Sequence, residues 1–368
     1  MKTLLPDYSN SILNLSNSIL KYYGVNDISH STLKIADDLL NKNHKNVILC
    51  LFDGMGFYNL EEHKSDAPYL YEHINKPLSS VFPPTTVAAT TAVLSGKSPI
   101  ETSWLGWDLY FKELDQNIDI FPNKLQMDYD TELEYIVSEK YIPYKNIFSR
   151  INEVNSEVTT NFISNYGDIH YKDLSDALNI LKDINSRNER RFSYFYYTFP
   201  DAAMHKYGIN SKEVTDVLKE IDSFVKDLSE SMEDTLIMCI ADHGLIDIDW
   251  LYLEEYPDIY KMLERVPSIE ARAASLFVKD EYKNDFELAF NKEFSEYFLL
   301  VSKKDILKKN LFGEGKPHPR SEGFIGDYLA IATDKYCMGI SRMEDNLKAL
   351  HAGITEKEMM VPFIVIEK

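Results

Sequence analysis

The chain has 368 residues, of which 44% are hydrophobic and 27% charged, and its formal net charge is −20. This balance is typical of a globular protein with one large domain or two smaller ones. Such an acidic surface repels nucleic-acid backbones and anionic lipid headgroups, which argues against a nucleic-acid polymer or a membrane as the partner.

The three cysteines indicate the compartment. They are scattered through apolar runs, at Cys50, Cys239 and Cys337, which is typical of buried, reduced thiols. The N-terminus does not resemble a signal peptide, and no apolar stretch approaches the roughly 20 residues that a membrane helix needs. We therefore expect a cytoplasmic protein.

Three apolar runs each lead to an aspartate, and each run predicts a buried strand. Their apolar character is continuous rather than alternating, which is typical of strands covered on both faces. Ligand sites in open parallel sheets form at the carboxyl ends of the strands, so we expect the three aspartates to meet at one edge. Their charges would be costly to hold together without cations. The runs are residues 46–52, 191–200 and 235–241, and the aspartates that follow them are Asp53, Asp201 and Asp242.

Helical segments separate the predicted strands. Residues 211–231 place apolar side chains at helical spacing, with charged residues between them. Residues 326–333 and 360–366 predict further strands. Because strands alternate with helices, we expect an α/β fold whose mostly parallel central sheet is flanked by helices.

The segment 266–315 differs from the rest of the chain. It predicts a strand, a helix and another strand, followed by a basic, polar stretch. We interpret it as a small inserted α+β cap, with residues 1–265 and 316–368 forming the core. The stretch 108–150 is rich in Asp, Tyr, Asn and Pro and predicts a long, partly irregular excursion near the site.

Histidines accompany the aspartates in a pattern that indicates metal ligands. His205 follows Asp201 by four residues, so a helical turn would place both on one face. His243 directly follows Asp242, and His351 lies in a turn-rich stretch before the last strand. Mixed Asp and His ligands suit zinc or manganese. Surface or core positions are the ordinary interpretation of a lone histidine, and we keep it for His30, His44, His63 and His73.

A candidate nucleophile lies in residues 81–99, which read VFPPTTVAATTAVLSGKSP. Two prolines stop the preceding chain, and a helix of small residues can follow them with Thr86 at its start. A helix N-terminus favours an ionised hydroxyl, and metal coordination would lower the pKa of Thr86 further. The alternative is an N-cap threonine in a tightly packed helix.

The order of these segments resembles the alkaline phosphatase superfamily, and in particular its type I phosphodiesterase/nucleotide pyrophosphatase branch. The matching features are a strand followed by Asp53-Gly54, the proline–threonine segment, DAAMHKYG at 201–208, Asp-His-Gly at 242–244 and a late histidine. The resemblance spans roughly residues 46–368 and implies an alkaline-phosphatase-like core.

The resemblance also implies roles for individual residues. It gives Asp201, His205 and His351 to one metal. It gives Asp53, Asp242 and His243 to the other, with Thr86 beside it as the nucleophile; counting back from Gly96 selects Thr86 rather than Thr85. Members of the branch use two zinc ions, or sometimes manganese, and form a covalent phospho- or nucleotidyl-threonine. The implied substrate is a small anionic phosphate ester or nucleotide.

One position departs from the pattern of the branch. Where phosphodiesterases usually carry an asparagine that holds a phosphoryl oxygen, this chain has Trp107. The indole could stack on a base or sugar, or pack under the cap. Arg320, near His318, is either a phosphate clamp or part of a charged surface loop. Two alternatives therefore stay open: a phosphomonoesterase or phosphonate hydrolase on the same site, and a metal-bound pseudoenzyme that only binds a nucleotide.

Overall fold

A six-stranded sheet forms the centre of the computed structural model, which describes residues 1–342 and 347–368. Strand β1 pairs in parallel with β7 and β8, and β6 pairs in parallel with β7. Strand β17 runs antiparallel to both of its neighbours. The predicted α/β fold with a mostly parallel sheet is confirmed. In spatial order the strands are β2 (Ile74–Ser79), β17 (Met360–Glu367), β8 (Thr235–Ile240), β1 (Asn46–Phe52), β7 (Arg190–Tyr197) and β6 (Val158–Ile163).

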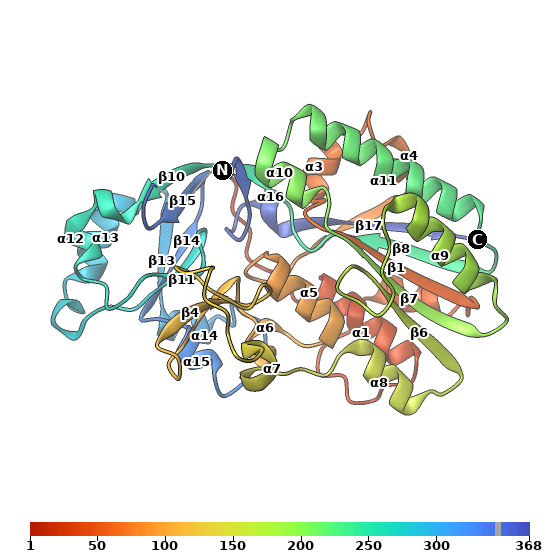
Figure 1. Ribbon diagram of the computed structural model, residues 1–368, viewed down its shortest axis with the longest axis horizontal. Coiled ribbons are helices and arrows are strands. Elements are labelled where there is room, and N and C mark those ends of the chain that lie inside the picture. Colours follow the sequence, from red (N-terminus) through yellow and green to blue (C-terminus); the bar gives the residue numbers. More distant parts are fainter. Residues whose placement is uncertain (343–346) are drawn as a thin grey trace.

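Helices cover both faces of this sheet (Figure 1). Every residue of β1 and β8 is buried, which explains why their sequences are apolar without alternation. The predicted strands at 46–52 and 235–241 and the predicted helix at 211–231 are confirmed, with β8 ending one residue earlier, at Ile240. One face carries α9 (Leu174–Ser186), α10 (Asp201–Tyr207) and α11 (Lys212–Glu230), and the other α1 (Ile12–Tyr22), α5 (Thr86–Ser95) and α8 (Ile147–Val154).

A second, seven-stranded sheet lies beside the central one (Figure 1). All its strand pairs are antiparallel. It takes β11, β12 and β13 from the predicted cap at 266–315, and the other strands from outside that segment. The stretch 108–150 thus contributes sheet strands, while the division into core and cap stays a prediction. The strands are β13 (Phe298–Ser302), β14 (Tyr328–Ala332), β12 (Ala273–Leu276), β11 (Ser268–Glu270), β3 (Asp108–Phe111), β4 (Gln116–Asp119) and β5 (Lys124–Leu125).

Short elements connect and cover the two sheets. Strand β10 (Asp249–Tyr252) pairs with β15 (Tyr336–Gly339), and β9 (Ile246–Asp247) with β16 (Ala349–Leu350). Among the described residues, no helix is both long enough and apolar enough to cross a bilayer. The remaining α-helices are α2 (Lys34–Leu40), α3 (Phe57–Glu62), α4 (Pro68–Glu72), α6 (Pro99–Thr102), α7 (Val137–Tyr141), α12 (Pro257–Tyr260), α13 (Phe286–Phe294), α14 (Lys303–Lys308), α15 (Ser321–Phe324) and α16 (Glu356–Met359).

Helix α5 is buried almost throughout, which positions the residue at its start. Its small side chains allow close packing against α1, and only Leu94 among its ten residues is partly exposed. Thr85 precedes the helix in an extended conformation, so Thr86 is its first residue. The helix ends at Gly96, whose φ of 68° is left-handed and whose missing side chain leaves room for Leu20. The sequence thus holds Thr86 on a rigid element.

Candidate active site

The structure brings all the predicted ligands to the carboxyl edge of the central sheet. Asp53 follows β1 directly, Asp242 follows β8, and Asp201 begins α10 after β7. The potential ligand atoms form two groups, and within each group all of them lie within 4.8 Å of one another. Both groups include Asp201. The first group is Asp201, His205 and His351, and the second is Asp53, Asp201 and His243.

In the first group, a hydrogen bond orients His205. Its Nδ1 donates to the carbonyl of Ala349 at 2.7 Å, so Nε2 is the ring nitrogen that faces the other potential ligands. That Nε2 lies 3.1 Å from Asp201 Oδ1. His351 completes the group, with its ring centroid 5.2 Å from that of His205. An imidazole nitrogen and a carboxylate oxygen that face one another, with the other ring nitrogen bonded to a backbone carbonyl, are an arrangement that can hold a metal ion.

Asp53 and His243 of the second group, together with Asp242, surround the hydroxyl of Thr86. His243 Nε2 lies 3.1 Å from Thr86 Oγ1, 3.5 Å from Asp53 Oδ1 and 3.4 Å from Asp242 Oδ2. The Thr86 hydroxyl is also 3.4 Å from Asp53 Oδ1. Asp242 and His243 are fully buried, and Thr86 is 7% exposed. The candidate nucleophile therefore shares one small space with three potential ligands.

Electrostatics at this edge favour a bound cation. Burial, followed by the charges of Asp242 and Asp201, raises the pKa of Asp53 well above its ordinary value. Burial likewise raises the pKa of Asp242, and burial together with His243 and His205 lowers that of His351. Cations bound between these side chains would favour the ionised carboxylates and so lower their pKa values. The donor set therefore fits divalent metal ions.

Several buried polar atoms in the cluster have no hydrogen-bond partner. Such atoms are costly unless something else satisfies them. They belong to four of the predicted ligands: Asp201 Oδ1, Asp242 Oδ2, His243 Nδ1 and His351 Nδ1. The two carboxylate oxygens have only a histidine Nε2 nearby, at 3.1 and 3.4 Å, and both are potential ligand atoms, which is a second reason why this edge could hold metal ions.

Glycines let the ligand-bearing loops approach one another. Gly54 has a left-handed φ of 71°, and a Cβ there would lie 2.8 Å from Asp201 Cβ. Its backbone N–H donates to Asp242 Oδ1 at 3.0 Å, which orients that carboxylate. The glycine after Asp53 is therefore needed for its conformation and for the space that it leaves.

A buried ion pair that sequence reasoning missed supports the His351 loop. Arg272, in the turn between β11 and β12, donates to both oxygens of Glu358, at 2.6 and 2.8 Å, and both side chains are fully buried. Glu358 also accepts from the backbone N–H of Gly353 at 2.8 Å, two residues after His351. The two residues are 86 positions apart, so no local pattern could have paired them.

Glu270 is a second residue that the sequence analysis did not single out. Its Oε1 accepts from Thr85 Oγ1 at 2.5 Å and from the backbone N–H of Trp107 at 2.9 Å. Burial raises the pKa of Glu270 to about 7. The residue connects strand β11 to the segment that precedes the candidate nucleophile.

The predicted substrate-binding residues make other contacts. Trp107 Nε1 donates to Asp119 Oδ2 at 3.0 Å. His318 Nδ1 lies 3.1 Å from the hydroxyl of Ser103, and Arg320 forms a bidentate ion pair with Glu113. None of these contacts involves a predicted metal ligand, and a role in substrate binding stays a prediction.

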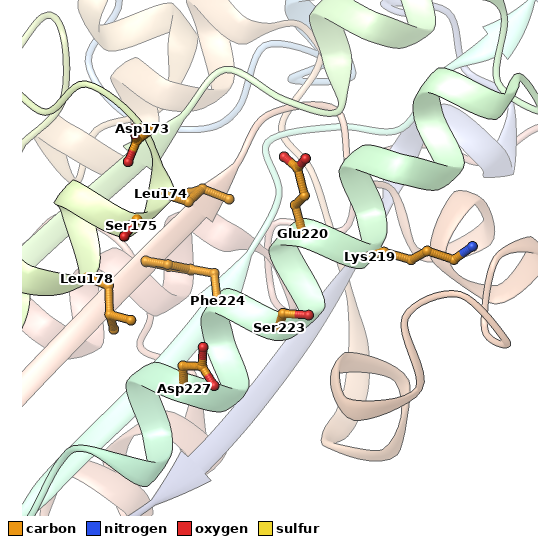
Figure 2. A pocket seen from close by; sticks show the side chains of 9 residues that line it. All are labelled: Asp173, Leu174, Ser175, Leu178, Lys219, Glu220, Ser223, Phe224 and Asp227. Carbon is orange, nitrogen blue, oxygen red and sulfur yellow. The ribbon is translucent and has the colours of Figure 1, made fainter.

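A groove of about 470 Å³ lies between α9 and α11, on the outside of the helices (Figure 2). Its lining mixes apolar residues such as Leu178 and Phe224 with Asp173, Lys219 and Glu220. None of the predicted site residues lines it. Although this groove is large, the candidate chemistry lies at the carboxyl edge of the sheet, because the ligand atoms converge there.

The central sheet and the potential ligands at its carboxyl edge define an α/β protein with a candidate metal site. The model of the type I phosphodiesterase/nucleotide pyrophosphatase family matches residues 47–351, and the chain belongs to that family. The protein is therefore a hydrolase of phosphoric ester or anhydride bonds. The resemblance inferred from the motifs is confirmed.

Solved structures with the same fold include mammalian ectoenzymes. The murine ectonucleotide pyrophosphatase/phosphodiesterase 5 is 14% identical, with a TM-score of 0.66 and 87% of each chain covered. The human protein of that name is 15% identical, with the same TM-score and coverage. An inactive threonine-to-alanine variant of the murine protein, in complex with AMP, is equally similar. Among curated proteins, no sequence matches the chain.

Proposed function

We propose that the protein hydrolyses phosphodiesters or nucleotide pyrophosphates through a covalent phospho-threonine on Thr86, at a site for two divalent metal ions. One observation carries this proposal: the hydroxyl of Thr86 lies within hydrogen-bonding distance of a ligand-type histidine, at the start of a buried helix. The helix N-terminus favours the ionised form of a hydroxyl in that position, which is the form that attacks phosphorus.

Each ligand group has its own task. Asp53, Asp242 and His243 would hold one ion beside Thr86, and Asp201, His205 and His351 would hold the other. When bound, such ions lower the pKa of a hydroxyl and stabilise a leaving oxygen. The Thr86 oxygen forms a bond to phosphorus while the bond to the leaving alcohol or phosphate breaks, and the proton of the hydroxyl balances the charge of the leaving oxygen. Water then breaks the bond between Thr86 and phosphorus, which releases the remaining phosphate monoester and restores the hydroxyl.

Zinc is the metal that we propose, with manganese as the alternative. The donor set of imidazole nitrogens and carboxylate oxygens without cysteine supports this choice. The substrate that we propose is a small phosphate ester or nucleotide, supported by the family and by the AMP complex of the murine protein.

Two adjacent threonines provide the test of the nucleophile. We expect Thr86→Ala to reduce turnover of bis-p-nitrophenyl phosphate by at least about a thousandfold while zinc content is unchanged. The matched control is Thr85→Ala, whose hydroxyl contacts Glu270 instead of the ligands. Losing that hydrogen bond should cost no more than about tenfold in turnover. Near-normal turnover in Thr86→Ala would falsify the assignment.

Substrate preference separates the proposal from the phosphomonoesterase or phosphonate hydrolase. Turnover of bis-p-nitrophenyl phosphate is compared with that of p-nitrophenyl phosphate, before and after EDTA. Preference for the diester, lost with EDTA and restored by zinc, supports the proposal. Preference for the monoester selects the alternative, and no turnover of either ester by the zinc-loaded protein selects the pseudoenzyme.

We also propose that the protein acts in the cytoplasm. The three cysteines are buried thiols, which supports a reducing compartment. Fractionation of the source cells tests this proposal, and recovery of the protein outside the cytoplasm would contradict it.

A further inference from the structure

A carboxyl group on the second sheet contacts the residue that precedes the proposed nucleophile. Glu270, at the end of β11, accepts a hydrogen bond from Thr85 Oγ1 at 2.5 Å, and Thr85 directly precedes Thr86. We propose that Glu270 is a positioning residue, which fixes the start of α5 and so the place of the Thr86 hydroxyl among the potential metal ligands. This inference rests on the proposed function and adds a residue that acts through Thr85 rather than on the substrate.

The hydroxyl of Thr85 does not make the hydrogen bond that its position favours. A threonine at the N-cap position ordinarily accepts a hydrogen bond from a backbone N–H in the first turn of its helix. Thr85 is the N-cap residue of α5, but its side chain makes no such bond and donates to Glu270 instead. The contact therefore connects the start of α5 to the second sheet, where an ordinary cap would stabilise the helix alone.

A second hydrogen bond to the same oxygen includes a third segment. Glu270 Oε1 also accepts from the backbone N–H of Trp107 at 2.9 Å. Trp107 lies between α6 and β3, so one oxygen connects β11, the start of α5 and this segment. Gly106 allows the close approach, because a Cβ there would lie 2.5 Å from the carbonyl oxygen of Ile269. Loss of the Glu270 carboxylate would therefore free Thr85 and leave a backbone N–H without its partner.

The backbone is strained at two apolar residues beside the site. Among the described residues other than glycine, the only apolar ones with a left-handed backbone are Ile269 and Ala352, with φ of 77° and 87°, and both are fully buried. This conformation is costly, most of all for a β-branched side chain, and such strain concentrates at functional sites. Ile269 directly precedes Glu270, and Ala352 directly follows the predicted ligand His351. The strain at Ile269 thus lies where it sets the direction of Glu270.

The same turn of the second sheet supports the opposite side of the site. Arg272 follows Glu270 by two residues and donates to both oxygens of Glu358. That ion pair supports the loop that carries His351. Residues 270–272 therefore hold the segment before the nucleophile and a ligand loop from one rigid hairpin. Such a shared support keeps the Thr86 hydroxyl in a fixed relation to the ligands, which is what attack on a bound phosphorus requires.

Two substitutions of similar size test this role. Glu270→Gln keeps an oxygen that can accept both hydrogen bonds, whereas Glu270→Met fills the same space with no oxygen. In the zinc-loaded protein with bis-p-nitrophenyl phosphate, we expect Glu270→Met to lower kcat about 20-fold or more, with KM changed less than about threefold. Its zinc content should equal that of the unsubstituted protein. Glu270→Gln should keep at least about a third of kcat, because its amide oxygen replaces the carboxylate oxygen.

A double substitution tests whether the effect passes through Thr85. Thr85→Ala removes the donor of the same hydrogen bond. The variant that combines it with Glu270→Met should have nearly the kcat of Glu270→Met alone, because one bond can be lost only once. A kcat that falls by the product of the two single effects would overturn the inference.

Thr85→Val provides the test should Glu270→Met not fold. This substitution keeps the shape of threonine but cannot donate to Glu270. We expect kcat to fall by about three- to tenfold at unchanged zinc content, which is the effect of one lost hydrogen bond. An unchanged kcat would overturn the inference.

A glutamate beyond the other end of α5 provides the matched control. Glu101 also accepts from a backbone N–H, that of Ser98 at 3.0 Å, and from a side chain, His30. Glu101→Met removes the same kinds of bond away from the ligands, so it should lower the melting temperature and change kcat less than about twofold. A loss of kcat as large as that of Glu270→Met would overturn the inference, because any weakening near α5 would then slow the reaction.

The outcomes separate the inference from the proposed function. If Thr86→Ala retains near-normal turnover, the proposed function fails, and Glu270 has no nucleophile to position. If Thr86→Ala is inactive and Glu270→Met changes kcat less than about threefold, the proposed function stands and the inference is overturned. Loss of zinc from Glu270→Met would also overturn it, because the carboxylate would then support the metal site instead of the nucleophile.

Discussion

A histidine and a carboxylate lie near each end of helix α5, but their polar atoms lack hydrogen-bond partners at one end and have them at the other. At its N-terminal end, Asp242 and His243 are buried beside Thr86, and each has a polar atom without a hydrogen-bond partner. Beyond its C-terminal end, His30 and Glu101 are also nearly buried and lie 2.5 Å apart. Both ends thus combine histidine with a carboxylate in a dry environment.

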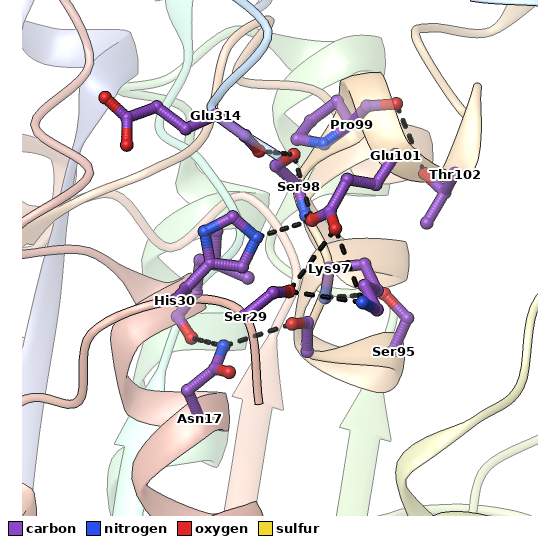
Figure 3. A network of polar contacts seen from close by, with 12 residues as sticks. Asn17, Ser29, His30, Ser95, Lys97, Ser98, Pro99, Glu101, Thr102 and Glu314 are labelled. Atoms are coloured by element: carbon purple, nitrogen blue, oxygen red, sulfur yellow. Dashed lines mark hydrogen bonds and ion pairs between the residues drawn. The ribbon is translucent and has the colours of Figure 1, made fainter. Parts of the chain in front are cut away.

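Beyond the C-terminal end of α5, both oxygens of the Glu101 carboxylate have hydrogen-bond donors (Figure 3). Glu101 accepts from His30, from the backbone N–H of Ser98 at 3.0 Å and from Lys97 at 3.3 Å. Ser98 in turn donates to the carbonyl of Glu314, which connects this end to the segment after α14. Proximity of histidine and acid therefore does not identify a metal site; unsatisfied lone pairs facing one another do.

The largest expected effect tests whether the cluster at the N-terminal end of α5, which contains Asp53, Asp242 and His243, binds cations. Asp242→Asn keeps the acceptor for Gly54 but removes the charge. We expect zinc affinity to fall by more than about 100-fold, since losing even an outer partner of a ligand costs 10–100-fold. Metal analysis and isothermal titration measure this change.

The same substitution should have the opposite effect on the metal-free protein. With zinc removed by EDTA, Asp242→Asn relieves repulsion with Asp53 and should stabilise the fold by about 1 kcal/mol. Asp222→Asn is the control, because that buried aspartate accepts from a backbone N–H outside the cluster. A lower melting temperature for the metal-free Asp242→Asn protein would show that the carboxylate is structural, as Glu101 is.

Breaking the Arg272–Glu358 pair should disturb the N-terminal cluster from a distance. Arg272→Met leaves Glu358 buried and unpaired, which typically costs about 3–5 kcal/mol. Because Glu358 holds the loop that carries His351, we also expect zinc stoichiometry to fall from two per chain to one. Arg150→Met is the control: it removes a contact with the carbonyl of Ser95 at the other end of α5, and stoichiometry should not change. Two zinc ions per chain in Arg272→Met would contradict the role of the pair.

A smaller effect, with a defined pH dependence, is expected at the C-terminal end. Burial alone would raise the pKa of Glu101, but hydrogen bonds from His30 and Ser98 outweigh it and lower the pKa to about 2. The ionised carboxylate therefore stabilises the fold above its ordinary pKa of about 4.5, and this contribution is lost as the pH falls toward 2. Glu101→Gln should cost about 1–3 kcal/mol in urea unfolding at neutral pH, and less near pH 3. An equal cost at both pH values would contradict this account.

The sequence predicted the central sheet and the ligand edge for a physical reason. Strands buried on both faces are continuously apolar, and their carboxyl ends meet at one edge, so Asp53, Asp201 and Asp242 could be grouped without a structure. Glu270 and Arg272 could not be predicted, because their partners come from distant segments that only the second sheet brings close. The strands in the stretch 108–150 were not predicted because they are only two to four residues long, which is too short for a periodic pattern to appear in the sequence.

The smallest expected effect concerns Trp107, where the chain departs from the family pattern. Its indole donates to Asp119 and packs edge-on against Phe121, with ring centroids 6.0 Å apart. Because this side chain is engaged with the second sheet, Trp107→Phe should cost about 1 kcal/mol of stability and change KM for a diester less than about threefold. A KM that rises tenfold with unchanged stability would instead show that the indole stacks on substrate. Trp107, in the segment between α6 and β3, would then be a binding residue beside the ligands at the N-terminal end of α5.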